Sequence, residues 1–317
     1  MLLVVLGHSV AFWANQNWFD ALAPVYDSDI LFILSKFISH FHVYAFTLIS
    51  GFIFCYVKKD RRGYTSLKEL IKKKSKRLLI PYVCVLFLWV IPFYVVIYKP
   101  SIKTIILRFF LGTHVNQLWF LLMLFEVFLI AWLLVTYVKK LFWGFGIAIL
   151  LYFIGIFCNF YVPNCFQVWK ALQFVVFFFL GYVIYEKNIQ AKSYRVVFCF
   201  FLDVAFFIVL LIIPMNRVLK EILELFSHLI GAVTAFFVLD RIVSICKKGV
   251  ILRFIRDYSM GIYLLHQQLI WISLLIFNGK VPAISNAVIN FIVGFSISTS
   301  IVFFLKKNKI GRIILGE

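Results

Sequence analysis

Histidines are the side chains of this chain best suited to chemistry, and His8 is the most informative of them. It lies in the apolar run Met1–Val10. An ionisable group inside a lipid-embedded helix is costly, so its presence there indicates a functional site. An imidazole can act as a general base or as a nucleophile near neutral pH. His266 lies in another long apolar run. The alternative is that both histidines only make hydrogen bonds between packed helices.

Depth along the predicted helices suggests that these histidines share a site with Ser50. Helix rise places His266 ~12 Å and Ser50 ~10 Å from the predicted inner ends of their spans. His8 reaches a middle depth if its helix extends upstream. We therefore predict one inner or central cavity that contains all three side chains.

A basic run, Lys72–Arg77, stands directly before the apolar stretch Leu78–Tyr82. One interpretation is a cytoplasmic anchor that only fixes topology. The other is a cationic rim for an anionic ligand, in which Arg77 grips phosphate with two hydrogen bonds and Lys76 adds charge.

Polar residues at the predicted outer ends of the spans are candidates for binding a polar ligand. His114, Asn116 and Trp119 lead into the fourth predicted span. Trp119 is equally typical of an interfacial aromatic belt. Glu126 and Asp203 are carboxylates within spans, and we expect them to be paired or neutral. Glu126 could orient a histidine or bind a hydroxyl, or it could make only an interhelical contact.

The composition indicates that membrane-spanning helices carry these residues. The chain is 64% hydrophobic and 14% charged, with a mean hydropathy of +1.00, whereas soluble domains are roughly 45–50% apolar and about 25% charged. We therefore predict an all-α, polytopic transmembrane bundle that forms one domain over residues 1–317. The predicted spans are 1–14, 37–57, 78–98, 118–138, 141–160, 170–186, 196–213, 226–244, 259–278 and 285–305.

The distribution of positive charge predicts that both termini are inside. With that orientation, 24 of the 32 Lys and Arg residues lie in inside loops, as the positive-inside rule requires. The net charge of +19 then needs no nucleic-acid partner. The first segment covers only ~20 Å of a ~30 Å hydrocarbon core. Either this helix is unusually short or it is truncated, and we favour truncation. The six cysteines have no C-x-x-C spacing, and we expect no metal site.

Five short blocks, in order along the chain, resemble the membrane-bound acyltransferase 3 family of bacterial glycan O-acyltransferases. His8 lies in the first of these blocks and His266 in the last. Val43-Tyr44 replaces the usual Met-Pro, and the basic residue usual about ten positions before the first-helix histidine would lie upstream of Met1. The blocks are Val4–Ser9, Phe41–Phe52, Lys76–Tyr82, Leu118–Leu121 and Ser259–His266.

This resemblance implies transfer of an acetyl or other short acyl group from cytoplasmic acyl-CoA to a hydroxyl of an envelope or extracellular polysaccharide. The protein would be a multi-pass protein of the inner (plasma) membrane, in contact with lipid, with acyl-CoA as a substrate and no bound cofactor. His8 would be the catalytic base or acyl carrier, supported by His266. The implied donor-binding residues are Lys76, Arg77 and Ser50, and the implied acceptor-binding residues are His114, Asn116, Trp119, Glu126 and His42.

Two other classes of function remain open from the sequence. A transporter or flippase of a lipid-linked sugar would also have many spans and buried carboxylates, although we find no internal repeat of the kind many transporters show. A catalytically inactive member of the fold is the third possibility. His40 and His228 have no assigned role.

Overall fold

The computed structural model describes residues 1–15, 18–245 and 249–317, and this part of the chain contains helices and no strands. The α-helices are α1 Leu2–Val10, α2 Asp29–Ser39, α3 His42–Lys59, α4 Leu67–Lys74, α5 Ile80–Val85, α6 Ile91–Tyr98, α7 Ile102–Ile105, α8 Trp119–Tyr137, α9 Leu141–Tyr161, α10 Val168–Glu186, α11 Ser193–Ile212, α12 Arg217–Ile245, α13 Val250–Phe277, α14 Ala283–Leu305 and α15 Lys309–Ile314.

Nine helical segments of the described residues are long and apolar enough to cross a membrane, and Leu2–Trp13 is a shorter apolar helix. Together they account for the ten predicted segments, so the all-α polytopic prediction is confirmed. The nine are Asp29–Lys59, Leu67–Tyr98, Asn116–Tyr137, Leu141–Tyr161, Cys165–Glu186, Ser193–Ile212, Arg217–Ile245, Arg253–Phe277 and Ala283–Leu305.

Several helices begin earlier than hydropathy indicated. The second segment starts at Asp29 instead of residue 37, because the Ser28 hydroxyl accepts a hydrogen bond from the Leu31 amide and caps a first turn there. The third starts at Leu67 instead of residue 78, and Ser66 caps it in the same way. The added turns of the third segment are mostly polar and carry no hydropathy signal, whereas those of the second contain apolar residues such as Leu31. Both predicted starts were wrong.

The long segment Leu67–Tyr98 widens into π-helical turns before each of its prolines. Ser75–Leu79 precedes Pro81, and Leu86–Val90 precedes Pro92. A proline ring collides with the carbonyl four residues earlier in a regular helix, and a wider turn relieves that collision. Arg77 belongs to the first of these turns.

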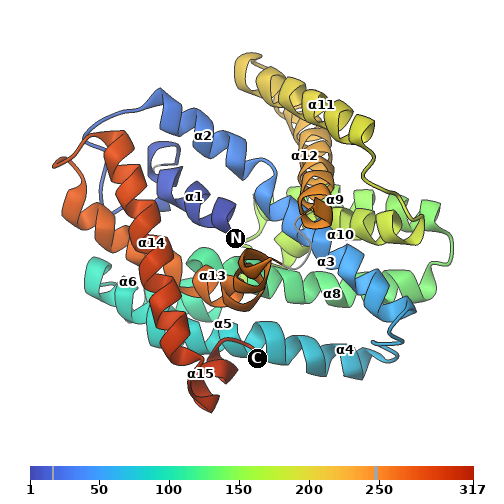
Figure 1. Ribbon diagram of the computed structural model, residues 1–317, viewed down its shortest axis with the longest axis horizontal. Coiled ribbons are helices and arrows are strands. Elements are labelled where there is room, and N and C mark those ends of the chain that lie inside the picture. Colours follow the sequence, from blue (N-terminus) through green and yellow to red (C-terminus); the bar gives the residue numbers. More distant parts are fainter. Residues whose placement is uncertain (16–17, 246–248) are drawn as a thin grey trace.

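The helices form two groups around the middle of the molecule (Figure 1). The short helix α1 packs against α2, α13 and α14, whereas α3, α8 and α9 pack around α10. Helices α11 and α12 pair with each other, and α12 also contacts α3. Helices α1, α3, α8 and α13 each contribute side chains to the lining of one cavity.

Helices α3 and α10 approach closely enough to require glycine. A Cβ on Gly51 would lie 1.8 Å from the Phe178 carbonyl oxygen, and a Cβ on Gly181 would lie 1.9 Å from that of Leu48. Small residues permit such close backbone packing in membrane helices. The neighbouring Ser50 lines a cavity outside this contact.

A buried histidine–carboxylate pair ties α11 to the start of α3. His40 Nε2 lies 2.8 Å from Asp203 Oδ1, and both side chains are almost fully buried. His228 Nδ1 donates to the His40 carbonyl oxygen at 2.7 Å. The expectation that Asp203 is paired is confirmed, and this cluster gives His40 and His228 a structural role.

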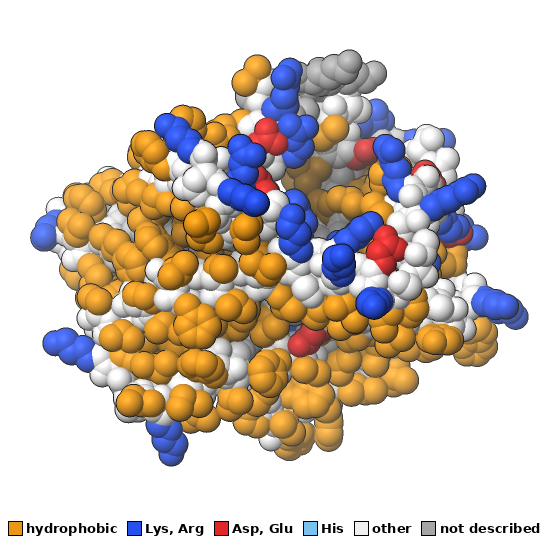
Figure 2. Space-filling view, turned by 90° about the horizontal axis from the view of Figure 1, so that it is seen from below, with side chains coloured by type: hydrophobic (Ala, Val, Ile, Leu, Met, Phe, Trp, Pro, Cys, Tyr) orange, Lys and Arg blue, Asp and Glu red, His pale blue; other side chains and the backbone are white. Residues whose placement is uncertain are grey.

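One face of the molecule carries Lys and Arg side chains gathered round a hollow, next to a broad hydrophobic surface (Figure 2). That division is typical of a membrane protein whose loops carry the charge.

Candidate functional site

His8 and His266 are directly hydrogen-bonded although 258 positions separate them. His8 Nδ1 lies 2.8 Å from His266 Nε2. The ring centroids are 4.9 Å apart and the ring planes differ by 19°. The rings are therefore nearly coplanar and meet edge to edge, which is good hydrogen-bond geometry. Helices α1 and α13 supply one histidine each.

The hydrogen bonds fix the tautomer of each ring in its neutral state. His266 Nδ1 lies 2.9 Å from the Ile262 carbonyl oxygen, which can only accept, so Nδ1 carries the proton. His266 Nε2 is then an acceptor, and His8 Nδ1 must donate to it. The remaining nitrogen, His8 Nε2, is left with its lone pair available. This is the atom that a general base needs, and no hydrogen bond to it is found within the described residues.

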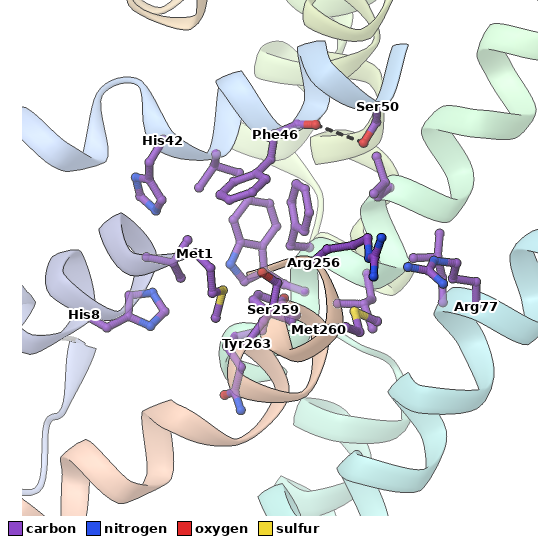
Figure 3. Close-up of a pocket in the computed structure, with 18 residues that line it drawn as sticks. Met1, His8, His42, Phe46, Ser50, Arg77, Arg256, Ser259, Met260 and Tyr263 are labelled. Atoms are coloured by element: carbon purple, nitrogen blue, oxygen red, sulfur yellow. Dashed lines mark hydrogen bonds between the residues drawn. The ribbon is translucent and has the colours of Figure 1, made fainter. Parts of the chain in front are cut away.

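A first cavity of about 310 Å³ opens beside His8. Arg77 lies at one end of it and His8 and His42 lie at the other (Figure 3). Its lining residues are Met1, Val4, His8, His42, Val43, Phe46, Ser50, Arg77, Leu78, Gln117, Trp119, Phe120, Leu121, Leu124, Arg256, Ser259, Met260 and Tyr263.

Two polar side chains of α3 present acceptors in this cavity. The Ser50 hydroxyl donates to the Phe46 carbonyl oxygen at 2.9 Å, which leaves the lone pairs of Ser50 Oγ free (Figure 3). His42 Nδ1 lies 2.8 Å from the Ile38 carbonyl oxygen, so in the neutral ring Nε2 is the acceptor. The cavity thus combines an apolar body, two arginines and a few placed acceptors.

A second cavity of about 280 Å³ also has His8 in its lining. It is far more polar, and helix ends and loops build most of it. Its lining residues are His8, Asn15, Trp18, Arg108, Thr113, His114, Val115, Asn116, Gln117, Trp119, Gln167, Lys170 and Gln267.

Three residues line both cavities: His8, Gln117 and Trp119. They therefore form the partition between the two cavities. Gln117 is fixed there because its amide pairs with that of Gln268 at 2.8 and 3.1 Å and also donates to the Leu264 carbonyl oxygen at 2.8 Å. These bonds hold the start of α8 against α13, directly beside His266.

Hydrogen bonds between two loops shape the second cavity. The Gln167 amide donates to the carbonyl oxygens of Gly112 and Thr113, and the Phe166 amide donates to that of Leu111 at 2.7 Å. Asn116 and Gln167 both have left-handed backbones, with φ of 50° and 68°. Such conformations cost energy in residues with a side chain and are concentrated at functional sites.

Comparison with known families shows to which family the chain belongs. A family model described as an acyltransferase domain, that of the acyltransferase 3 family, matches residues 1–306. The chain belongs to the acyltransferase 3 family. This protein is therefore a multi-pass membrane acyltransferase of the kind that transfers groups other than aminoacyl groups. No curated protein and no solved structure matches the chain.

The structure of this acyltransferase brings most of the predicted site residues together. Ser50, Arg77 and His42 line the first cavity, so His42 lies with the predicted donor residues. His114 and Asn116 line the second cavity.

Three predicted residues lie outside both linings. His266 is fully buried behind His8. Lys76 is exposed on the π-helical turn that carries Arg77. Glu126 lines neither of the two cavities, and its Oε2 is buried without a hydrogen-bond partner in the described residues.

Sequence reasoning missed two cations of the second cavity, Arg108 and Lys170. Each follows or interrupts a strongly apolar run, and a cation in such a run is a functional signal in a membrane protein. Arg256 and Tyr263 of the first cavity were also missed, although Tyr263 stands within the last family block. The Tyr263 hydroxyl donates to the Gln117 carbonyl oxygen and so helps to hold the partition.

Proposed function

We propose that this acyltransferase moves an acetyl or other short acyl group from acyl-CoA to a hydroxyl of a cell-envelope or extracellular polysaccharide, at the plasma membrane. The observation that carries the proposal is the place of His8. It lines both cavities, and its Nε2 has no partner among the described residues. A donor in one cavity and an acceptor in the other would meet at this nitrogen.

The chemistry is general-base catalysis. His8 Nε2 removes the proton of the acceptor hydroxyl while the oxygen attacks the thioester carbonyl carbon. The carbon–sulfur bond then breaks, and the leaving CoA sulfur takes the proton back from His8. The products are an ester and free CoA, so no other reactant is needed. His266 acts as a positioning residue, because its Nε2 holds His8 Nδ1 and stabilises the imidazolium that forms during transfer.

A covalent route uses the same geometry. His8 Nε2 attacks the thioester itself, CoA leaves, and the acyl-imidazole is transferred to the hydroxyl in a second step. Both routes require the histidine to reach both substrates.

The first cavity has the properties of a donor site. A volume of about 310 Å³ is at the lower end of ligand pockets and suits an acyl thioester with part of its pantetheine arm. Arg77 is exposed and lines the cavity, so it can bind phosphate groups outside it. Arg256 also lines the cavity, but its guanidinium already pairs with the carboxylate of Asp257. Ser50 offers an acceptor within it. In the predicted topology this cavity opens on the inner side, where acyl-CoA is found.

The second cavity has the properties of an acceptor site. Its lining is rich in amides and other polar groups, which suit sugar hydroxyls. Trp119 supplies an aromatic surface, and His114 and Asn116 lie beside it in the lining. In the predicted topology the loops that form this cavity face outside.

The test is transfer by purified protein in lipid nanodiscs. The wild-type protein should release CoA from acetyl-CoA and place the acetyl group on an envelope glycan, whereas His8→Ala should do neither. Free thiol release and glycan-bound acetate are measured separately. Thiol release also separates an acyltransferase from a flippase, which does not consume acetyl-CoA.

The matched control is His228→Gln, a histidine outside both cavity linings, which should keep the transfer activity. Unchanged transfer by His8→Ala at equal protein level would refute the assignment of His8.

A further inference from the structure

The second cavity carries positive charge that nothing in its lining neutralises. Arg108 and Lys170 are among its thirteen lining residues, and none of the thirteen is Asp or Glu. Within the described part of the chain, neither cation belongs to an ion pair. Lys170 lies inside the apolar segment Cys165–Glu186, and a cation within such a segment is normally paired or marks a pathway for a ligand.

The contacts of these two cations hold them in place without compensating their charge. The Arg108 guanidinium carbon lies 4.7 Å from the Tyr94 ring centroid, and its Nη1 donates to the Tyr94 hydroxyl at 3.2 Å. Lys170 Nζ lies 4.2 Å from the ring centroid of Trp119, which also lines the cavity. Aromatic faces attract cations, yet the full charge remains for a ligand.

Hydrogen-bond donors are also in excess around this cavity. Arg108 Nε and Asn116 Nδ2 are buried, and neither has a partner among the described residues. A buried donor without an acceptor costs about 1–3 kcal/mol, so such groups require an explanation. A ligand rich in acceptor oxygens would satisfy both at once.

The charge of the cavity acts on its own histidine as well. Partial burial lowers the pKa of His114, and the positive charges of Arg108 and Lys170 lower it further. His114 is therefore neutral at neutral pH and does not compete with a ligand as a third cation.

We propose that the acceptor carries an anionic oxygen group, a carboxylate or a phosphate, and that Arg108 and Lys170 bind it while a nearby hydroxyl faces His8. The proposal rests on the acyltransferase function above, and it specifies the acceptor as an acidic glycan or a glycan phosphate. The anionic group can be the carboxylate of a sugar acid or the phosphate that joins a sugar to its carrier. An arginine binds either one with paired hydrogen bonds.

The experiment measures binding and transfer with matched probes. The probes are a tetrasaccharide that contains glucuronate, the same tetrasaccharide with its carboxyl groups reduced to hydroxymethyl groups, and a neutral tetrasaccharide bearing one terminal phosphate. Binding to the protein in nanodiscs is measured by calorimetry without acetyl-CoA, and acetyl transfer is measured with it.

We expect an anionic probe to bind about 10- to 100-fold more tightly than the reduced probe, as for a charge-assisted hydrogen bond. Arg108→Gln and Lys170→Gln should each remove most of that difference. The matched control is Lys103→Gln, an exposed cation near Arg108 that lines neither cavity and should change nothing. Tighter binding of the glucuronate probe would identify a sugar-acid carboxylate as the anionic group. Tighter binding of the phosphate probe would identify the phosphate that joins a sugar to its carrier.

Equal binding of anionic and reduced probes, or no binding of any anionic probe, would overturn the proposal. If Arg108→Gln fails to fold, Lys170→Gln gives the same test from another helix. Failure of the acyltransferase function would look different, because the anionic probe would then bind in a way that depends on Arg108 but would never be acetylated.

Discussion

Removal of the His266 ring should slow transfer without weakening donor binding. His266→Ala deletes the acceptor that holds His8 Nδ1 at 2.8 Å. His8 is then free to rotate and to place its proton on Nε2, the nitrogen that must be unprotonated. The first cavity does not include His266 in its lining, so the donor site keeps its shape.

The size of the effect follows from the bond that is lost. During transfer His8 becomes an imidazolium, and its bond to His266 Nε2 becomes charge-assisted. Hydrogen bonds to charged groups contribute about 1.5–3 kcal/mol, and about 1.36 kcal/mol is a factor of ten in rate. We therefore expect kcat to fall by about 10- to 150-fold, with KM for acetyl-CoA changed by no more than about twofold.

The assay is steady-state CoA release in nanodiscs, with kcat and KM measured separately for the wild type, His266→Ala and His266→Gln. In His266→Gln the side-chain oxygen can accept the hydrogen bond from His8 Nδ1. This variant should recover most of the lost kcat. A purely structural histidine would not give this pattern, because its replacement would change thermal stability and donor KM together.

Two results would refute the reasoning. A drop in kcat below about twofold for His266→Ala would show that the bond does not act on the reaction. Equal loss in the Ala and Gln variants would show that the ring matters for packing instead of for its acceptor nitrogen.

The remaining predictions concern the donor rim and the helix packing. Arg77→Gln should raise KM for acetyl-CoA about 10-fold or more, because it removes a charge-assisted phosphate contact. The control is Lys68→Gln, which changes an exposed cation outside both cavities and should leave KM unchanged. Equal KM values for the two variants would show that the basic run only fixes the topology. Gly51→Ala should lower the free energy of unfolding by about 1–3 kcal/mol, because its Cβ would lie 1.8 Å from a carbonyl oxygen of α10. The control is Gly146→Ala, because a Cβ added there would have no neighbouring atom within 4 Å. Equal melting temperatures for the two variants would contradict the close packing of α3 and α10.

The sequence supplied the membrane character and the number of apolar segments because hydropathy depends only on local composition. It also singled out His8 and His266, since a histidine in an apolar run is conspicuous wherever the helix packs. It failed at the polar ends of helices such as Leu67–Tyr98, where capping extends the helix beyond the apolar residues.

Helix depth correctly suggested that His8 and Ser50 share a cavity, because rise per residue is constant along a helix. It was wrong to place His266 in the same cavity, because that side chain is buried behind His8 and is not part of the lining. It gave no information on rotation about the helix axis. Glu126 illustrates the difference, since its depth on α8 made it a candidate while its face of the helix keeps it out of both cavities.

The amino-acid sequence by itself determined the class of the protein, the number of its apolar segments and the residue types available for chemistry. Only the tertiary structure decided that His8 Nδ1 meets His266 Nε2, and that Arg108 and Lys170 line a different cavity from Arg77, with His8 in the lining of both. The physical reason is that contacts between helices distant in the chain depend on how their faces rotate and pack. That packing is a property of all the helices together, and no single segment contains it.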